Sequence, residues 1–377
     1  MENSLSKDLG VLDGIGLGIG TIIGGTIYSA LGLANKLTGG HPELAFFLSF
    51  MVALFVAKVY SDIVSRKPSS GGTYSVVNDG LGKVLGLPAA ILQFFGYSVA
   101  SAFYAWVFSD YFSAVFGGDP KVISLLVICF LTLILLLGAK ESGRFTLVLS
   151  GFKVFVLLSI GFLAIYFLGI KINPRLPSLS NVVKAAFVIF FGFEGFEVIA
   201  SASEEMRDPE RDVPRSMFAS LGLVLAVYML LALSVNHLRS YNEKTILLSL
   251  ADIVLNGPGV FFVLAGSLTS TTTAALSSMY VSSRLLYKLS VEERIPRVFS
   301  LTWRRGSPYV ASLVTGVVAV LLAQSGTTMV LINWASLCFI ALFFLVSLSG
   351  LRLLRNKIFP TLAIVSLLTL VFFGYVL

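Results

Sequence analysis

The sequence predicts an all-α integral membrane protein with about eleven transmembrane helices. Of its 377 residues, 56% are hydrophobic and only 12% are charged, and the mean hydropathy is +0.90. A soluble domain is about 45–50% apolar and about 25% charged, so this chain has more apolar surface than a water-soluble core can bury. Its apolar residues also come in stretches of about 20, the length that crosses a bilayer. The lipid bilayer is therefore the expected solvent.

Each predicted span is an apolar stretch bounded by charged residues or by glycine and proline. Several of the stretches are long enough to cross the bilayer at a tilt. We expect a single membrane domain, 1–377, with the spans 9–34, 41–65, 84–117, 121–138, 142–169, 181–204, 216–238, 257–289, 308–325, 328–351 and 357–377.

Lysine and arginine are unevenly divided between the two sides of these spans. If the N-terminus is placed inside, 18 lie on the inner side, 7 on the outer side, and Lys58 and Lys153 within spans. Cytoplasmic loops carry the excess of positive charge in membrane proteins. We therefore expect a multi-pass protein of the plasma membrane with a cytoplasmic N-terminus and Leu377 outside. The net charge of +7 then requires no nucleic-acid partner.

Residues typical of metal sites, cofactor sites and enzymes are sparse. Cys129 and Cys338 both lie in apolar runs, where they are expected as small core residues, and His41 and His237 fall in predicted loops. No HExxH, CxxC or Walker-type motif is present. We expect no metal, no cofactor and no enzymatic activity, and no cleavable signal peptide.

The first span is interrupted by glycine. Between residues 14 and 28 it contains Gly14, Gly16, Gly18, Gly20, Gly24 and Gly25. One interpretation is close helix packing through small residues spaced four apart. The other is a break in the helix near 22–26, where free backbone groups would face a cavity and not lipid.

The sixth span has a second unusual centre. Glycines and carboxylates alternate with phenylalanine over residues 190–197, and Glu194 and Glu197 lie near mid-membrane. A carboxylate at this depth costs a few kcal/mol on insertion scales and is by default a functional-site hypothesis. The alternative is a pair of buried glutamates satisfied by neighbouring helices.

The two unusual spans are five apart. Interrupted helices at matching positions of two halves indicate a transporter whose site is built from inverted repeats. We expect a first repeat over 9–169, a second over 181–351 and an extra helix over 357–377.

Four segments resemble the amino acid–polyamine–organocation (APC) superfamily of permeases, in the same order and at similar spacing. They are 18–28 (GIGTIIGGTIY), Asp62 with 68–74 (PSSGGTY), 193–197 (FEGFE) with 204–215 (EEMRDPERDVPR), and 283–287 (SRLLY) with 295–296 (IP) and Pro308. The resemblance implies a LeuT-type fold of 5+5 inverted repeats, with helices 1 and 6 interrupted, and secondary transport of amino acids or amines.

The resemblance also assigns a substrate site to the two interrupted helices. Backbone at Ile22, Gly24, Gly25 and Thr26 would contact the substrate carboxylate. The amine and side chain would contact Phe190, Phe191, Phe193, Glu194 and Gly195. An interrupted helix suits this task because it offers N–H groups at one half-helix end and carbonyls at the other. Plain core or lipid-facing packing is the alternative for the three phenylalanines.

Lys153 is the predicted proton-coupling residue. It lies in the fifth span, where some proton-coupled relatives have a lysine in place of a sodium ion. A buried amine there can exchange a proton. Its expected partners are the Gly20 and Ile23 carbonyls and the span-eight hydroxyls Ser270, Thr272 and Thr273, with Glu197 as the next candidate. The alternatives are a lysine that extends to the interface and hydroxyls bonded to their own helix.

The sequence departs from the family pattern at three places. Thr26 stands where a glycine is usual and would narrow the approach of a carboxylate. Glu293 replaces the glycine that usually follows helix eight. Family members commonly have twelve helices, and eleven are predicted here.

Three functions follow from these features. The first is proton-coupled uptake of amino acids by alternating access. The second is exchange of one amino acid or amine for another in the same fold, and the third is a nutrient sensor that keeps the binding site without transport. Lys153 favours the first over the second, since an exchanger needs no proton site. The amino acid carried and the oligomeric state are not specified by the sequence.

Overall fold

The computed structural model describes residues 9–68, 72–137, 143–171, 173–238, 241–303 and 307–376. The centre of the predicted 68–74 motif and Leu377 lie outside these residues. Within them, all regular secondary structure is helical apart from one bridge between Leu9 and Met206. The prediction of an all-α protein is confirmed for this part of the chain.

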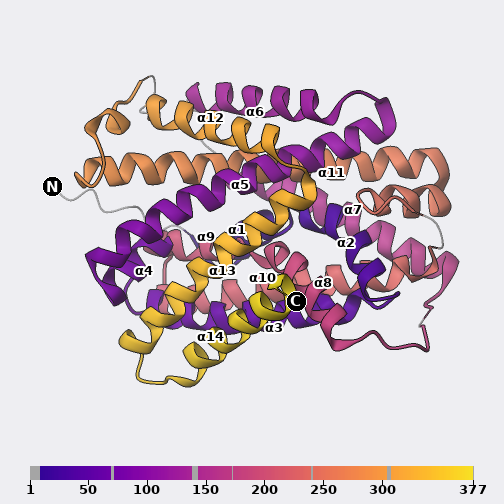
Figure 1. Ribbon diagram of the computed structural model, residues 1–377, viewed down its shortest axis with the longest axis horizontal. Coiled ribbons are helices and arrows are strands. Elements are labelled where there is room, and N and C mark those ends of the chain that lie inside the picture. Colours follow the sequence, from indigo (N-terminus) through magenta and orange to yellow (C-terminus); the bar gives the residue numbers. More distant parts are fainter. Residues whose placement is uncertain are drawn as a thin grey trace.

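Fourteen α-helices run through the described residues (Figure 1). In chain order they are α1 (Val11–Ile22), α2 (Thr26–Leu37), α3 (Pro42–Val64), α4 (Gly72–Leu81), α5 (Lys83–Phe116), α6 (Pro120–Leu136), α7 (Gly143–Leu168), α8 (Leu179–Phe190), α9 (Glu197–Ser201), α10 (Pro209–Ser234), α11 (Ile246–Val291), α12 (Tyr309–Ser325), α13 (Thr328–Leu353) and α14 (Ile358–Val371).

Helix is present in each of the eleven predicted ranges, but not every helix is long enough to be a membrane span by itself. Seven are long and apolar enough to cross a bilayer, namely α3, α5, α7, α10, α11, α13 and α14 with its extension to Tyr375. The pair α1 and α2 qualifies together as one bent span. α6 and α12 have 17 residues each and fall just short, and the sixth predicted span is divided into α8 and α9.

The structure contains one helix that was not predicted, and two other helices begin earlier than predicted. α4 follows α3 as a short helix where no span was predicted. α10 begins at Pro209 and not near residue 216. Proline is accommodated in the first turn of a helix, and the charged residues that follow Pro209 form helix outside the apolar stretch. α11 begins at Ile246, not near 257, and bends at Asn256, whose φ of 55° and ψ of −154° are not helical.

The helices pack as a bundle whose centre is occupied by the two broken pairs. In Figure 1, α6 and α12 lie along the upper edge, α3 and α14 lie below, and α1, α9 and α8 are nearer the middle. α1 packs against α7 and α10, and α8 packs against α13 and α3. α5 packs against α13 and α12, and α11 packs against α7 and α6.

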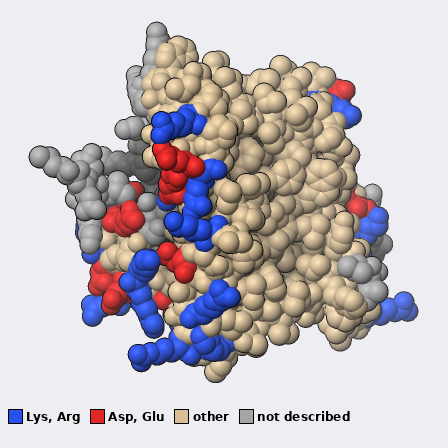
Figure 2. Space-filling view, turned by 60° about the vertical axis from the view of Figure 1, so that its left-hand side comes forward, with Lys and Arg blue, Asp and Glu red and all other residues tan. Residues whose placement is uncertain are grey.

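Charged side chains are concentrated at the two ends of this bundle. Figure 2 shows a dense group of lysine, arginine, aspartate and glutamate at one end, a smaller group at the opposite end, and an uncharged surface between them in that view. Large apolar side chains such as Phe130, Phe155 and Leu321 are exposed on the helices. An uncharged, apolar belt between charged ends is the surface that a bilayer covers.

Candidate functional site

The first span breaks between Ile22 and Thr26. α1 ends at Ile22, α2 begins at Thr26, and the two helix axes differ in direction by 56°. Ile23 has a φ of −76° and a ψ of 83°, outside the helical region. The break predicted at 22–26 is therefore confirmed. It leaves carbonyls at the end of α1 and N–H groups in the first turn of α2 without partners inside their helices.

The sixth span breaks beside the first. α8 ends at Phe190, a 3₁₀ turn covers Phe191–Phe193, and α9 begins at Glu197. Gly195 between them has a φ of +115°, which a residue with a side chain rarely adopts. A Cβ at Gly195 would lie 2.9 Å from the Ile22 nitrogen. Glycine therefore permits both the turn and the close approach of the two breaks.

Two side chains bond the breaks to each other. The Thr21 hydroxyl donates to the Gly195 carbonyl at 2.9 Å. The Tyr228 hydroxyl of α10 lies 3.3 Å from the Ile22 carbonyl oxygen and 3.1 Å from that of Gly192. The two breaks are therefore joined by hydrogen bonds.

Lys153 and Ser270 converge on the carbonyls at the end of α1. The Lys153 ammonium donates to the Gly20 carbonyl at 3.0 Å and lies 3.4 Å from that of Ile23. The Ser270 hydroxyl lies 2.9 Å from the Ile23 carbonyl oxygen and 3.0 Å from that of Gly24. Lys153 is only 1% exposed, so it does not extend to the surface of the protein. The Lys153 side-chain nitrogen thus lies at the break, against backbone carbonyls.

The other predicted hydroxyls of α11 are placed differently. Thr273 donates to carbonyls of its own helix, at Thr269 (2.9 Å) and Ser270 (3.0 Å). Thr272 is half-buried. Of the three predicted hydroxyls, Ser270 is therefore the one bonded to the break.

Glu194 and Glu197 have different surroundings although both are buried. One Glu197 carboxylate oxygen accepts from the Tyr97 hydroxyl at 2.8 Å, and the other accepts from the Gly195 N–H at 2.9 Å. Glu197 therefore holds the turn of the second break in place. Glu194 is 5% exposed and its carboxyl group adjoins that of Glu197.

Aromatic side chains close the space beside Gly24 and Gly25. A Cβ at Gly24 would lie 2.7 Å from the Tyr104 ring, and a Cβ at Gly25 would lie 3.0 Å from it. The Phe191 ring packs on Tyr104, with centroids 5.7 Å apart. Thr26 is 1% exposed and lies against Gly192. The first break thus faces an aromatic wall.

The other two predicted phenylalanines pack elsewhere. Phe190 packs against Phe343 of α13, with ring centroids 6.0 Å apart. Phe193 packs between Phe50 and Tyr228. Of the three predicted phenylalanines, Phe191 is therefore the one that packs on Tyr104 and Phe103, the rings next to Gly25.

Sequence reasoning did not single out four residues of this site. They are Thr21, Tyr97, Tyr104 and Tyr228. A tyrosine inside an apolar span normally brings its hydroxyl to a partner, which is a signal that could have identified Tyr97 and Tyr228. Tyr104 is recognisable only from its position beside the glycines.

The chain is similar to known membrane transport proteins. Residues 9–377 match a family described as "Amino acid permease". The chain is 26% identical over 351 residues to the branched-chain amino acid permease BcaP of Bacillus subtilis, covering 86% of this chain and 76% of that protein. It is 25% identical over 355 residues to cationic amino acid transporter 4, vacuolar, of Arabidopsis thaliana, covering 85% and 59%. It is 26% identical over 390 residues to the methylthioribose transporter of Bacillus subtilis, covering 94% and 83%.

Proposed function

Because this chain belongs to the amino acid permease family of the APC superfamily, we propose that it takes up amino acids together with protons by alternating access. The family is described as a permease family, and the named relatives are described as permeases or transporters. The observation that carries the proposal is the buried Lys153 ammonium on the Gly20 carbonyl, at the break in the first span.

In this proposal, Lys153 is the proton site, and it lies at the break where α1 moves during alternating access. Its positive charge binds α7 to the carbonyls at the end of α1, and charged donors form stronger hydrogen bonds than neutral ones. Loss of the proton weakens this tie and frees α1 to move relative to α7. Because coupling between sites is reciprocal, movement of α1 then changes the affinity of Lys153 for its proton.

The substrate lies between the two breaks in this proposal. Its carboxylate is received by the N–H groups at the start of α2, and its ammonium by Glu194 and the carbonyls beside it. Tyr104 and Phe191 fill this space now, so substrate entry requires them to move. The Thr26 side chain narrows the space for the substrate carboxylate and therefore favours small substrates.

The packing of the helices supports the 5+5 inverted repeat. When each span is paired with the span five further on, contacts recur in pairs. α1 with α7 corresponds to α8 with α13, and α5 with α13 corresponds to α11 with α7. α5 with α12 corresponds to α11 with α6. This recurrence is what a LeuT-type arrangement requires, with α14 as the extra helix.

The orientation follows from charge. Figure 2 shows that charged side chains gather more densely at one end of the bundle than at the other. The excess of lysine and arginine that the sequence gives the loops on the N-terminal side supports a cytoplasmic N-terminus, and we propose the plasma membrane as the location.

The names of the relatives suggest three chemically distinct substrates for an uptake assay. L-Leucine represents branched-chain amino acids, L-arginine represents cationic ones, and methylthioribose has neither an ammonium nor a carboxylate. We expect uptake of an amino acid into proteoliposomes, accelerated when the outside is acidic and independent of a sodium gradient. Uptake that needs an amino acid inside and ignores the pH gradient would instead identify an exchanger, and uptake of methylthioribose alone would remove the amino acid assignment.

A further inference from the structure

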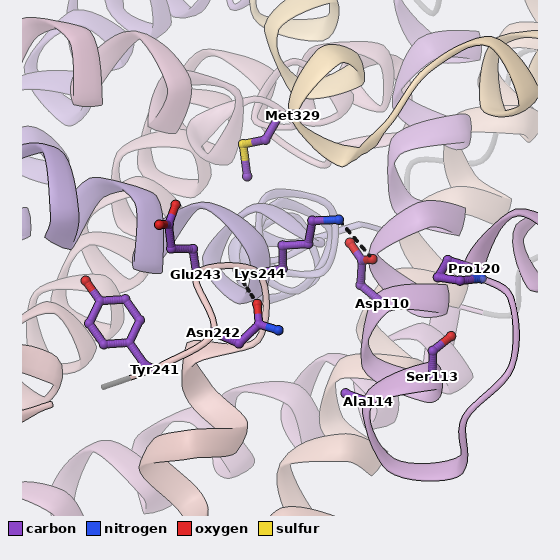
Figure 3. Close-up of a pocket in the computed structure, with 9 residues that line it drawn as sticks. All are labelled: Asp110, Ser113, Ala114, Pro120, Tyr241, Asn242, Glu243, Lys244 and Met329. Atoms are coloured by element: carbon purple, nitrogen blue, oxygen red, sulfur yellow. Dashed lines mark hydrogen bonds and ion pairs between the residues drawn. The ribbon is translucent and has the colours of Figure 1, made fainter. Parts of the chain in front are cut away.

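A second pocket lies far along α2 from the break. It has a volume of about 590 Å³ and is bounded by the end of α5, the start of α6, the start of α13 and the segment before α11. Figure 3 shows Lys244 and Asp110 reaching toward each other across it, with Glu243 and Tyr241 on one side and Ser113 on the other. The pocket therefore presents both signs of charge to one space.

The wall formed by the segment before α11 is held in place by α2. The Tyr241 hydroxyl accepts from the Asn35 amide at 3.1 Å, and Glu243 forms an ion pair with Lys36 at 2.5 Å. A Cβ at Gly32 would lie 2.3 Å from the Glu243 carbonyl oxygen, so the two segments are in direct backbone contact. This side of the pocket is thus formed before any ligand arrives.

Asp110 is a buried acid that is only partly satisfied. Its side chain is 6% exposed, and one carboxylate oxygen accepts from the Thr328 hydroxyl at 2.5 Å. The other oxygen faces the Lys244 ammonium at 3.6 Å, which is too long for a hydrogen bond. Ser113, nearby, has a buried hydroxyl oxygen with no partner among the described residues. A ligand with a donor can therefore improve on the contacts that exist.

We propose that this pocket is a second binding site for an amino acid. The ligand's ammonium replaces Lys244 at the Asp110 oxygen that Lys244 now faces, with the Ser113 hydroxyl beside it, and its carboxylate is bound by the released Lys244 ammonium. An α-amino acid suits the pocket because its ammonium and its carboxylate are attached to the same carbon atom and can reach Asp110 and Lys244 together. A molecule with one charge alone would engage only one member of the Asp110–Lys244 pair.

The position of the pocket gives this second site a role in entry. α2 runs from Asn35 and Lys36 at the pocket to Thr26 at the break, a distance of roughly 15 Å at 1.5 Å per residue. The hydroxyl of Tyr111, which follows Asp110 in α5, donates to the Tyr28 carbonyl of α2 at 2.8 Å. In the proposed orientation the pocket opens outward, so an amino acid meets it before it reaches the break. The ligand class, but not the pocket, rests on the proposed function.

The test counts binding sites in the purified full-length protein. Equilibrium binding of tritiated L-leucine and, separately, L-arginine is measured for the wild type, Gly25→Val, Gly25→Val/Asp110→Asn and Gly25→Val/Lys244→Gln. Asp110→Asn keeps an oxygen for Thr328, so the local fold has a partner. Lys171→Gln and Asp119→Asn, which remove charges outside the pocket, are the matched controls, and each variant must elute from gel filtration as the wild type does.

We expect two molecules of amino acid per wild-type chain and one for Gly25→Val, at ligand concentrations too low to fill the weakened site at the break. That remaining site is lost on adding Asp110→Asn and weakened at least about tenfold by adding Lys244→Gln, the effect of losing one charged hydrogen bond. Neither control should change the count. One molecule per wild-type chain and none for Gly25→Val would overturn the second site and leave the proposed function standing. No binding of either amino acid to the wild type would overturn both.

Discussion

Gly25 lies in the proposed carboxylate site at the first break, where an added side chain would meet close neighbours. A Cβ there would already lie 3.0 Å from Tyr104 and 3.2 Å from Val107, so a branched side chain must displace aromatic neighbours. Overpacking of this kind costs typically about 1–3 kcal/mol. The residue is therefore a sensitive probe of whether substrate binds beside it.

Gly25→Val should lower amino acid affinity about 10- to 100-fold at the break while the protein still inserts and elutes as the wild type. Gly222→Val is the matched control, because a Cβ at Gly222 meets no atom within 4 Å. Uptake and binding by both variants are measured side by side. Normal affinity in folded Gly25→Val would remove the first break from the substrate site.

Glu194 and Glu197 should respond differently to the same substitution. Glu197 is bonded through both oxygens to the fold, whereas Glu194 lies beside it and is the residue that the proposed function assigns to the substrate. Glu194→Gln should therefore change the ratio of L-leucine to L-arginine uptake, and Glu197→Gln should lower the thermal stability. An unchanged substrate ratio in Glu194→Gln would return that residue to a purely structural role.

Much of the site could be predicted because its residues are conspicuous in apolar spans. Glycine clusters, Glu194 and Lys153 each disfavour an ordinary membrane helix, so their presence points to a compensating reason. The aromatic wall could not be predicted. Phe190, Phe191 and Phe193 are the same residue type in one short segment, and only their tertiary neighbours distinguish them. Tyr104 is one of several tyrosines of α5, and only its tertiary position beside Gly24 and Gly25 distinguishes it.

The end of α11 shows how one element absorbs a departure from the family pattern. The helix ends in a Schellman motif, in which the Glu293 N–H donates to the Ser290 carbonyl at 3.1 Å and the Arg294 N–H to that of Leu289 at 2.8 Å. This motif places Glu293 at a φ of +57°, the conformation that favours glycine. The residue that replaces the usual glycine is therefore strained by the turn it must make.

Glu293→Gly should raise the free energy of unfolding by about 0.5–1 kcal/mol, because relief of the left-handed backbone exceeds the added freedom of the unfolded chain. The substitution also removes an exposed ion pair with Arg297, so Arg297→Gln is the control and should change stability by less than about 0.5 kcal/mol. Thermal unfolding of the purified variants is compared. A lower stability in Glu293→Gly than in Arg297→Gln would contradict this account.

The elements themselves were predictable to different degrees. Long apolar spans such as α3 and α13 were predicted within a few residues, since their length and composition are decided by the bilayer. α4 and the first part of α11 were not, because they are short helices at the span ends and owe their structure to packing. In α11 the Gly257-Pro258 pair marks a bend at Asn256 and not the start of the helix.

At the scale of the whole molecule, charge and span number together fix which loops face which side. Single cysteines at Ser300 and Asp119, in a background with Cys129→Ala and Cys338→Ala, test this arrangement. A membrane-impermeant maleimide added to intact cells should label position 119 and should label position 300 only after permeabilisation. Labelling of both positions in intact cells would contradict the predicted spans between them.

Proton coupling through Lys153 is the central claim, and the pH inside sealed proteoliposomes tests it most directly. With no gradient imposed, addition of a transported amino acid outside should acidify the interior of wild-type vesicles, because each amino acid enters with a proton. Lys153→Ala vesicles should show no acidification, and Lys184→Ala, which changes a lysine of α8 outside the break, should behave as the wild type. Uptake of labelled amino acid by the wild type with no change in internal pH would contradict the account.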